Sequence, residues 1–535
     1  MRLLLNDEQG LTSMRLESID VSIAELKRLV MQGGFEPLSP EGQRKLMALI
    51  ETVETVTELL AARNLTIEQL HTLLLGSRTT EKTRKVLGDD SKDQSQPKQR
   101  RSPLKGHGRN GAADYASASK VTVEHPTLKP KDRCPECLKG KVYPVKEGRS
   151  LVRIVGRPPL EATVYQLETF RCNLCDAVFT PPAPPEAGPD KYDYTAASMI
   201  ALLKYGTGFP FNRQQQLENY FGIPLPAATA WELVAAAAQK LAPIWEELIR
   251  QAAQGEIVYN DDTSMRILCF VREVSDQRTG LFTSGIVSVY GEHRIALFFT
   301  GSRHAGENLA GLLGHRNEKL GPPIQMCDAL SRNAPSPFKV ILGNCLAHAR
   351  RHFVNVTGAF PDQCRYVLET FREVFHFDDL ARQLQMDPSQ RLTYHRQHSR
   401  PLMDKLKVWS NQQLDERIVE PNSGLGKAIR YLLNHWLALT LFLRQAGAPI
   451  DSNVVERALK KAILHRRNSL FYRTQNGARV GDLFMSLIYT AELCGANPFD
   501  YLTQLQRHAE EVARSPGRWL PWTYRDNLPD SRLAA

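Results

Sequence analysis

The chain has 535 residues, and its 68 Lys and Arg against 58 Asp and Glu give a net charge of +10. A composition of 42% hydrophobic and 24% charged residues is that of a globular protein, which excludes a wholly disordered, collagenous or disulfide-scaffold chain. The length suggests about three or four domains, and the basic balance points weakly to a polyanionic partner. Because no run of about 18 apolar residues occurs and Asp7 and Glu8 interrupt the N-terminus, we expect a cytoplasmic protein with no membrane partner.

Residues 1–87 are predicted to be helical because apolar residues recur at steps of three and four, for example at Leu46, Leu49 and Ile50. The second helix of this segment either pairs with another copy as a short coiled coil or packs within its own domain. Residues 88–125 are predicted to be a basic, disordered linker, since the stretch 78–110 carries ten Lys and Arg against four Asp and Glu. A solvated tether is the simpler interpretation, and an arm that contacts phosphates is the alternative.

Residues 126–180 contain two Cys-x-x-Cys pairs, separated by 34 residues in which 151–155 and 163–167 alternate as strands do. Each pair fits a tight turn that directs two thiolates at one ion, and two such turns supply the tetrahedral four-sulfur set of a zinc site. Four protein sulfurs leave no coordination position for a substrate, so we expect a structural Zn²⁺. The predicted ligands are Cys134, Cys137, Cys172 and Cys175.

Residues 190–254 have a helical pattern. A helix that includes Arg213 is followed by a turn at 222–226 and by a longer helix from about Ala228, which fits a candidate helix-turn-helix. An ordinary helical hairpin gives the same pattern, so DNA contact by this pair is one of two interpretations.

The pattern changes at residue 255, where a helix at about 305–313 lies among short predicted strands at 256–261, 265–272, 280–290, 294–300, 323–328 and 338–342. Two of them end in acids, at Asp261 and Asp328, and a later helix carries Glu456 beside the edge of its apolar stripe. If the two strands are neighbours, these carboxylates meet at one sheet edge, where hard divalent ions that promote phosphodiester cleavage find oxygen ligands. Antiparallel strands, a helix and further strands follow one another in the order of a ribonuclease-H-like fold.

We therefore predict a multidomain α+β protein. Its ribonuclease-H-like catalytic domain comprises 255–360 and 447–485, is enlarged by a helical insertion at 361–446, and is followed by a C-terminal region at 486–535. The zinc-binding domain and the helical N-terminal segments precede it.

The chain resembles the transposases of the insertion sequence 66 family, members of the DDE superfamily, over most of its length. The most specific motifs are NDDT at 260–263, CLAHARRHF at 345–353, NVVERA at 453–458 and SLIYTAELCGANP at 486–498. The resemblance implies that Asp261, Asp328 and Glu456 form a catalytic triad that binds Mg²⁺ or Mn²⁺. It also implies that the partner is double-stranded DNA, as transposon ends and target, and that the protein acts as a homo-oligomer in the bacterial cytoplasm, associated with the nucleoid. Accessory proteins of the same element are further candidate partners, and the sequence leaves open whether they are required.

Two positions depart from that family's pattern. The family usually has Asp-Glu-Thr at the first acid, where this chain has Asp261 and Asp262, and the motif position favours Asp261 as the ligand. It usually has Asp-Gly-Tyr at the second acid, where Ala329 follows Asp328. Neither change removes a carboxylate, so an active enzyme is favoured over an inactive remnant.

Cys345 and His348 form a Cys-x-x-His pair after the second acid, similar to a motif in related DDE transposases. The spacing fits half of a metal site, but no second half is evident nearby, so we favour a structural role with the His348 ring close to the catalytic edge. Basic residues near the acids and in the candidate helix-turn-helix are predicted DNA contacts, although an ion pair with Glu456 would explain Lys460 equally well. They are Arg350, Arg351, Lys460, Lys461, Arg466, Arg467 and Arg213.

The leading hypothesis is a DNA transposase that cleaves transposon ends and joins the released 3′-hydroxyl to target DNA, using two metal ions and no covalent protein intermediate. The alternative is a catalytically inactive, zinc-dependent DNA-binding protein or regulator derived from a transposase.

Overall fold

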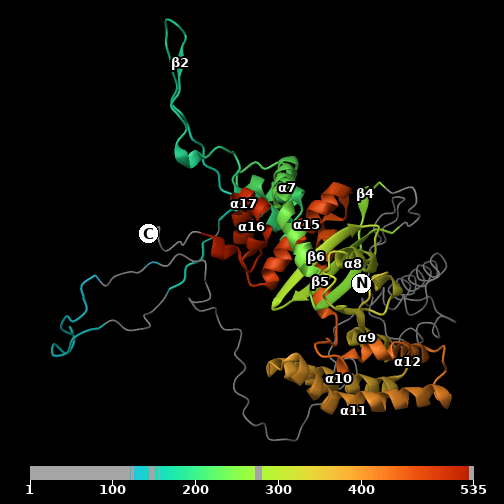
Figure 1. The fold of residues 1–535 in the computed structure, drawn as a ribbon. Helices are drawn as coiled ribbons and strands as arrows, with labels where there is room; N and C mark the ends of the chain where they lie inside the picture. Colours follow the sequence, from blue (N-terminus) through green and yellow to red (C-terminus); the bar gives the residue numbers. More distant parts are fainter. Residues whose placement is uncertain (1–120, 122–125, 144–150, 156, 272–279, 529–535) are drawn as a thin grey trace, which may run out of the picture. The chain divides into compact units, whose positions relative to one another are not determined.

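The computed structural model describes residues 121, 126–143, 151–155, 157–271 and 280–528 (Figure 1). The predicted N-terminal helices at 1–87, their candidate coiled coil and nearly all of the 88–125 linker lie outside the described residues. The part of the chain that the structure describes is an α+β protein built around a mixed five-stranded sheet, as the sequence predicted.

The order of strands in this sheet is β6-β5-β3-β7-β8. Strand β3 (Ile257–Ser264) is antiparallel to β5 (Phe282–Tyr290), which is antiparallel to β6 (His293–Gly301). On its other side, β3 is parallel to β7 (Ile324–Cys327), which is parallel to β8 (Ile341–Asn344). Three antiparallel strands followed by two parallel ones are consistent with a ribonuclease-H-like DDE domain.

One expected strand lies outside this sheet. Strand β4 (Ile267–Cys269) pairs with β9 (Tyr472–Thr474) in a separate two-stranded sheet. All eight residues of β3 are paired with β5, so β4 cannot pair with β3 on that side. A tight turn joins β5 to β6, and its first central residue, Gly291, has a φ of 57°. The antiparallel meander of the main sheet therefore consists of β3, β5 and β6, without β4.

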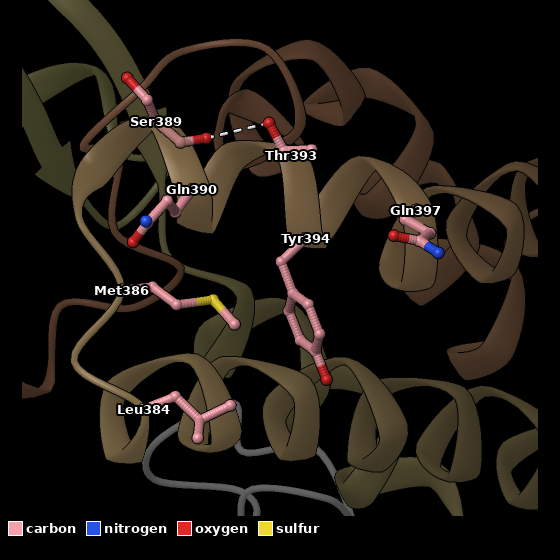
Figure 2. Close-up of a pocket in the computed structure, with 7 residues that line it drawn as sticks. All are labelled: Leu384, Met386, Ser389, Gln390, Thr393, Tyr394 and Gln397. Carbon is pink, nitrogen blue, oxygen red and sulfur yellow. Dashed lines mark hydrogen bonds between the residues drawn. The ribbon is translucent and has the colours of Figure 1, made fainter.

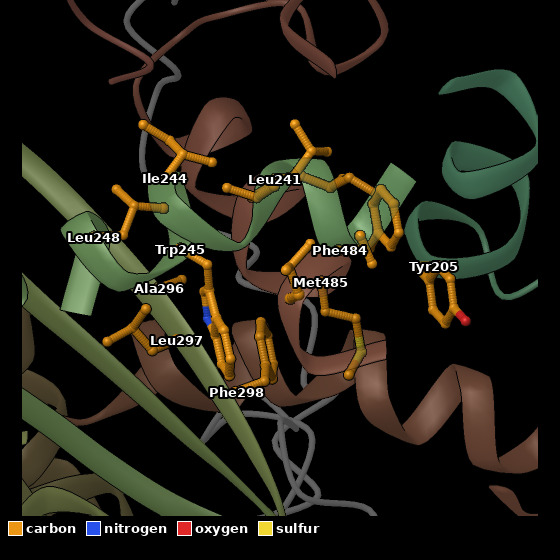
Figure 3. Close-up of a cluster of buried hydrophobic side chains, with 14 of the residues drawn as sticks. Tyr205, Leu241, Ile244, Trp245, Leu248, Ala296, Leu297, Phe298, Phe484 and Met485 are labelled. Carbon is orange, nitrogen blue, oxygen red and sulfur yellow. The ribbon is translucent and has the colours of Figure 1, made fainter. Parts of the chain in front are cut away.

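The core forms where α7 (Ala227–Ala252) and α15 (Gln475–Leu493) meet the sheet (Figure 3). Leu241, Ile244 and Leu248 of α7 recur at helical spacing and are fully buried, together with Leu297 and Phe298 of β6. Helix α7 is the second helix of the candidate helix-turn-helix. Residues 190–254 therefore share one hydrophobic core with the sheet rather than forming a separate one.

Helix α15 covers the exposed edge of β6. Three polar residues spaced four apart on one face of α15 accept hydrogen bonds from alternate N–H groups of β6: Asp482 from Thr300 at 2.7 Å, Ser486 from Phe298 at 3.0 Å and Thr490 from Ala296 at 3.1 Å. An uncovered edge strand presents such N–H groups to other chains. Because one continuous helix makes these bonds, the boundary expected between residues 485 and 486 falls inside α15.

Helices occupy most of the predicted insertion. Helices α10 (Pro361–Gln383) and α11 (Pro388–Asp415) pack side by side, followed by α12 (Gly424–Asn434) and α13 (Trp436–Leu439) (Figure 1). Helix α11 begins where Asp387 accepts hydrogen bonds from the N–H groups of Ser389 and Gln390, while Gln390 accepts one from Asp387. Helix α12 packs against α9 (Leu346–Val356), which follows β8, so the insertion returns to the sheet.

The other helices complete the described part of the chain. None of the helices in the described ranges combines the length and apolar character needed to cross a membrane.

Near the cysteine pairs, the residues expected as strands at 151–155 and 163–167 are exposed and unpaired, and short strands β1 (Phe170–Arg171) and β2 (Val178–Phe179) pair instead. The remaining helices are α5 (Tyr194–Ala201), α6 (Phe211–Tyr220), α8 (Ala305–Leu313), α14 (Asn453–Ser469), α16 (Pro498–Arg507) and α17 (Ala509–Arg514).

Candidate active site

Asp261 lies within β3, next to the end of β7. The two strands pair in parallel with Tyr259 opposite Met326, and β7 ends directly before Asp328. Extending this register by two residues brings Asp261 level with Asp328. Strand β5 continues to pair with β3 beyond this point. Asp261 therefore lies inside a strand, whereas the sequence had suggested that it lies at a strand end.

Glu456 approaches the same edge from α14. Asp261 is paired with Gly285 of β5, and directly opposed residues of neighbouring strands point to the same face of a sheet. A Cβ on Gly285 would lie only 3.0 Å from the Cδ2 atom of Leu459, so the glycine allows α14 to pack closely on this face. Glu456 lies in the first turn of α14, three residues before Leu459, which directs its carboxylate towards the Asp261 side of the sheet.

Two basic side chains from α9 flank the Glu456 carboxylate. His348 Nε2 lies 3.7 Å from Oε1, and Arg351 Nη2 lies 3.9 Å from Oε2. Both distances are longer than a hydrogen bond, and Oε1 is buried with no hydrogen-bond partner among the described residues. The carboxylate is therefore oriented while one of its oxygens remains available to a further ligand.

Asp328 receives a hydrogen bond from the helical insertion. Its Oδ1 accepts from the N–H of Ala329 at 2.7 Å and from the hydroxyl of Tyr431 on α12 at 2.9 Å. The Tyr431 ring in turn lies 4.1 Å from the ring of His352 and 4.9 Å from that of His435, measured between centroids. The insertion thus helps to orient the second acid.

Buried amides fix β3, β7 and the segment after Asp328 relative to one another. Gln325 Nε2 donates to Asn260 Oδ1 and to the carbonyl of Asn333, both at 2.7 Å, and Asn260 Nδ2 donates to the same carbonyl at 3.0 Å. Asn333 Nδ2 donates to the carbonyl of Asp328 at 3.2 Å. Because all three amides are fully buried, these bonds hold the two acid-bearing strands in one register.

The electrostatics around Asp261 disfavour its ionised form. Burial raises the pKa of Asp261 to about 6, the N–H of Asp262 opposes this rise, and the negative charges of Asp262, Asp328 and Glu456 add to it. Two of the three carboxylates that contribute to this effect, Asp328 and Glu456, are acids predicted from the sequence. Such crowding is relieved by a cation that binds between them.

Asp262 points to the opposite face of β3. Its side chain is 2% exposed, with His304 Nδ1 at 2.9 Å from Oδ2 and Arg332 Nη2 at 3.3 Å from Oδ1. Both of its oxygens therefore have partners. Helix α8 packs on this face of the sheet, where Asn308 donates a hydrogen bond of 2.8 Å to Ser284 of the neighbouring strand β5.

The predicted DNA contacts divide into exposed and bonded residues. Arg213, Lys460 and Arg467 are exposed. Lys461 binds the carbonyl of Gly206 and the carboxylate of Glu492, and Arg466 donates to Thr263 and Ser264 at the end of β3. Arg350 is half-buried, and Arg351 lies beside Glu456. Arg351 and Arg466 therefore have structural contacts close to the acids, and the exposed residues are those open to phosphates.

The helix pair that contains Arg213 is joined tightly. Gln215 of α6 accepts a hydrogen bond from the N–H of Ala227, the first residue of α7, and Gly222 in the turn has a φ of 75°. The exposed charged residues of α7 are Glu232, Lys240, Glu246 and Arg250, and Arg250 forms an ion pair with Glu247. Two acidic and two basic residues, one of the basic residues already ion-paired, are weak support for phosphate contact, so the helix-turn-helix function stays a prediction.

Each cysteine pair forms a tight turn. The N–H of Cys134 donates to Gly140 and that of Leu138 to Cys134, and in the second pair Cys172 donates to Ala177 and Asp176 to Cys172. Backbone N–H groups lower the pKa of the Cys137 and Cys172 thiols, which favours thiolates. In the described ranges the four sulfurs are not within 4.8 Å of one another as a group. The four-sulfur zinc site therefore stays a prediction.

The one group of three or more possible metal-ligating side chains found within 4.8 Å of one another, in the part of the chain described, is Cys345, His348 and Glu456. The sequence had assigned Cys345 and His348 a structural role, with the histidine near the catalytic edge. The ring lies beside Glu456, which is a third potential ligand that the sequence pattern did not reveal.

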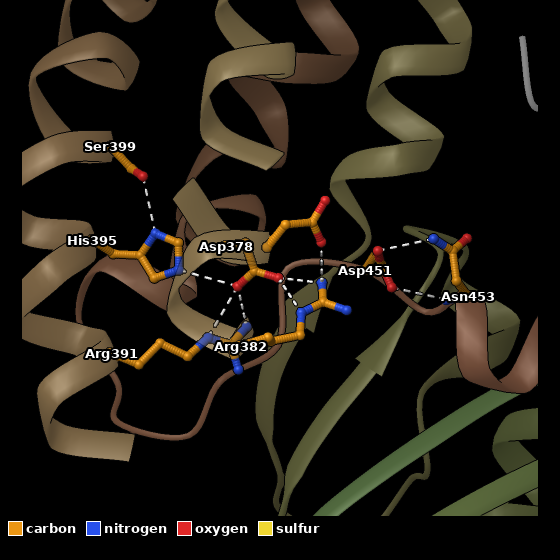
Figure 4. Close-up of polar contacts among 8 residues, drawn as sticks. Asp378, Arg382, Arg391, His395, Ser399, Asp451 and Asn453 are labelled. Atoms are coloured by element: carbon orange, nitrogen blue, oxygen red, sulfur yellow. Dashed lines mark hydrogen bonds and ion pairs between the residues drawn. The ribbon is translucent and has the colours of Figure 1, made fainter. Parts of the chain in front are cut away.

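A second carboxylate cluster lies between α10 and α11 (Figure 4). Asp378 is fully buried and binds Arg382, Arg391 and His395, whose Nε2 lies 3.2 Å from Oδ1; His395 Nδ1 lies 2.9 Å from Ser399 Oγ. Burial acts to raise the pKa of Asp378, but the hydrogen bond from His395 and the charges of the two arginines outweigh it, so the pKa lies well below its usual range. Every polar partner here is supplied by the insertion itself.

A shallow hollow of about 580 Å³ lies where α10 leads into α11 (Figure 2). Its lining consists of neutral side chains, without an acidic, basic or cysteine residue. The residues are Leu384, Met386, Ser389, Gln390, Thr393, Tyr394 and Gln397. The hollow therefore offers no charged side chain that could bind a divalent metal ion.

Comparison with known proteins gives one family match. Residues 192–480, more than half of the chain, match the family model described as the Transposase IS66 family. This range includes Asp261, Asp328 and Glu456 and excludes the two cysteine pairs.

Three similar proteins come from Sinorhizobium fredii (strain NBRC 101917 / NGR234). The protein named "Uncharacterized protein y4jD" is 26% identical over 74% of this chain and 79% of its own length. "Uncharacterized protein y4hP" is 24% identical, covering 77% and 76%, and "Uncharacterized protein y4qI" is 24% identical, covering 61% of each chain. These names state no activity.

Proposed function

Because the chain belongs to the IS66 family of transposases, DDE enzymes that act on DNA with divalent metals, we propose that it cleaves the ends of a DNA transposon and joins the released 3′-hydroxyl to target DNA. We assign the catalytic triad to Asp261, Asp328 and Glu456. The observation that carries this assignment is the crowding of Asp261 by the charges of the other two acids, in a site where Glu456 Oε1 is buried without a partner.

The three acids fit Mg²⁺ or Mn²⁺, because hard divalent ions bind carboxylate oxygens. Basic side chains do not occupy all of these oxygens, since Glu456 Oε1 has no hydrogen-bond partner among the described residues. When bound, a pair of such ions supplies the charge that activates the attacking water or 3′-hydroxyl and stabilises the leaving oxygen. The Tyr431 hydroxyl donates a hydrogen bond to Asp328 Oδ1, and the Arg351 guanidinium lies 3.9 Å from Glu456 Oε2. These contacts keep the carboxylates in place before the ions arrive.

Asp261 is a better ligand than its neighbour Asp262 on physical grounds. The two residues lie on opposite faces of β3. Both oxygens of Asp262 are engaged by His304 and Arg332, whereas Asp261 faces α14 and Glu456. In our proposal Asp262 supports the strand, and Asp261 binds metal.

The remaining parts of the proposal concern partners. We propose that Cys134, Cys137, Cys172 and Cys175 bind a structural Zn²⁺, which draws support from the two similar turns and the lowered thiol pKa values. Exposed Arg213, Lys460 and Arg467 are the proposed phosphate contacts. Two transposon ends must be brought together, so the working complex is at least a dimer on double-stranded DNA, with accessory proteins of the same element as further candidate partners.

The test uses DNA that carries the sequences flanking the gene, incubated with Mg²⁺ and the full chain. We expect Asp328→Asn to abolish strand cleavage while DNA binding remains. Asp379→Asn, which alters an exposed acid of α10, is the matched control and should cleave as the unaltered protein does. Binding without cleavage by the unaltered protein would support the alternative, an inactive DNA-binding regulator, and unchanged cleavage by Asp328→Asn would refute the triad.

A further inference from the structure

Three side chains of different chemistry converge beside the proposed catalytic acids. Cys345 Sγ, His348 Nε2 and the Glu456 carboxylate offer ligand atoms that all lie within 4.8 Å of one another. We propose that they form a second metal site, selective for a transition-metal ion of the zinc class, and that an ion bound there inhibits the enzyme by removing Glu456 from the Mg²⁺ site. The inhibition rests on the proposed function, whereas the binding site does not.

The fold brings the three ligands together for simple reasons. Cys345 directly follows β8 and precedes the first residue of α9, so its side chain lies at the start of that helix. His348 follows three residues later, and residues three apart share one face of a helix. Glu456 occupies the first turn of α14, and the N–H of Leu346 donates to the carbonyl of Ile450 just upstream, which ties the two helix starts together.

The separations suit a tetrahedral ion. Ligand atoms bound to zinc at about 2.0–2.3 Å lie roughly 3.4–3.6 Å from one another. His348 Nε2 and Glu456 Oε1 are already 3.7 Å apart, and the largest separation in the group is no more than 4.8 Å. No hydrogen bond to His348 Nδ1 opposes the small ring movement that would close this gap.

Two further observations point to an ion rather than to packing alone. Glu456 Oε1, the oxygen nearest His348, is buried and unpartnered, which is costly unless a ligand completes the site. Cys345 Sγ accepts a hydrogen bond from the N–H of Ser452 at 3.2 Å. Such outer contacts orient metal ligands and stabilise a thiolate.

The chemistry selects against Mg²⁺ at this position. A thiolate and an imidazole are ligands for zinc and other softer ions, whereas Mg²⁺ prefers oxygen. Zinc is bound by the thiolate form of a cysteine, so the Cys345 thiol gives up its proton when the ion binds. Binding then breaks the S–H bond, releases one proton to solvent and forms the sulfur–metal bond, with no change in oxidation state.

The consequence is competition for Glu456. The carboxylate is shared by the proposed Mg²⁺ site and by the Cys345–His348 pair, and its Oε1 is the atom nearest the imidazole. An ion held by all three ligands would leave Asp261 and Asp328 without the third acid. Free zinc should therefore stop strand cleavage even when Mg²⁺ is abundant.

The experiment first measures binding. The full chain is equilibrated with micromolar free Zn²⁺, and bound zinc per chain is determined by mass spectrometric metal analysis. We expect Cys345→Ala and His348→Ala each to retain about one zinc ion fewer than the unaltered protein. Cys364→Ala is the matched control, because Cys364 is another buried cysteine, on α10, and it should retain the full amount. Equal zinc content in all four proteins would overturn the site.

The second measurement is strand cleavage in Mg²⁺ with and without that zinc, each variant being compared with its own zinc-free rate. We expect zinc to reduce cleavage by the unaltered protein and by Cys364→Ala about tenfold or more, and by the other two variants less than about twofold. If zinc binds as expected but cleavage by the unaltered protein is insensitive to it, the inhibition is refuted. That outcome also removes Glu456 from the proposed triad and leaves the zinc site standing. His348→Ala alters a partly exposed side chain, so the test remains decisive should Cys345→Ala fold poorly.

Discussion

Two regions of this protein bury carboxylates, and they do so with opposite results. Between α10 and α11, Asp378 is surrounded by two arginines and a histidine, and its pKa is held below the usual range. At the sheet edge, Asp261 is surrounded by other carboxylates, and its pKa rises to about 6. Burial acts in the same direction at both sites, so the sign of the neighbouring charges decides the outcome.

The difference separates a structural site from a chemical one. The Asp378 cluster supplies its own countercharges and needs nothing from outside the protein. The acid edge keeps like charges close together and leaves Glu456 Oε1 buried without a partner. Carboxylates that repel one another stay close together only if the surrounding fold holds them, and a bound cation offsets their repulsion. Such clusters are typical of functional sites.

The largest effect should come from the two neighbouring aspartates of β3. Asp261→Asn should reduce cleavage of transposon-end DNA by about 10³-fold or more, because a lost metal ligand forfeits several kcal/mol of transition-state stabilisation. Asp262→Asn should cost far less, since its oxygens bind His304 and Arg332 on the other face. Single-turnover cleavage rates check this, and a larger loss in Asp262→Asn would reverse the assignment.

Removing the buried acid of the insertion should act on stability instead. Asp378→Ala leaves two arginines and a histidine without their shared partner, so we expect a loss of about 3–5 kcal/mol in the free energy of unfolding. Denaturant unfolding followed by circular dichroism measures it. Asp379→Ala, at the exposed neighbouring position, should change it by less than about 1 kcal/mol. Equal losses would mean that the Asp378 cluster adds nothing beyond a surface ion pair.

A third buried carboxylate sharpens the rule. Asp482 is buried, and its carboxylate accepts hydrogen bonds from the neutral N–H and hydroxyl of Thr300. Burial raises its pKa to about 7. The folded state therefore binds this proton more tightly than the unfolded chain. Its stabilising contribution is complete below about pH 4 and is lost as the pH rises to about 7, a change of roughly 3–4 kcal/mol. Thermal unfolding across this range should show the loss in the unaltered protein and a much weaker one in Asp482→Asn.

The smallest effect should come from the contact between the insertion and the second acid. Tyr431→Phe removes the hydroxyl that donates to Asp328 and preserves the ring against His352. We expect the Mg²⁺ concentration for half-maximal cleavage to shift by about tenfold, because a hydrogen bond to a charged group contributes at least about 1.5 kcal/mol and about 1.4 kcal/mol is a factor of ten. Tyr366→Phe, on α10 beside Trp409, is the control. An unchanged Mg²⁺ requirement would show that Tyr431 does not position Asp328.

Much of the framework follows from local patterns in the sequence. The apolar runs predicted β3, β5, β6, β7 and β8, the helical spacing of apolar residues predicted α14, and helical composition predicted the insertion. The family match also confirms the resemblance that the motifs carried. Short runs were less informative, since β4 joined β9 and 151–155 and 163–167 formed no strands. Such runs pair only when a neighbouring edge is free, and that depends on other parts of the chain.

The sequence by itself determined which side chains are acidic, which segments form strands and helices, and which family the chain resembles. Only the tertiary structure decided that Asp261 and Asp262 face opposite ways, because the pairing of β3 with β5 and β7 sets the faces. It also decided that Tyr431 reaches Asp328 across 103 residues and that Glu456 meets Cys345 and His348. These contacts join segments distant in the chain, and their energies come from packing and charge that no local pattern encodes.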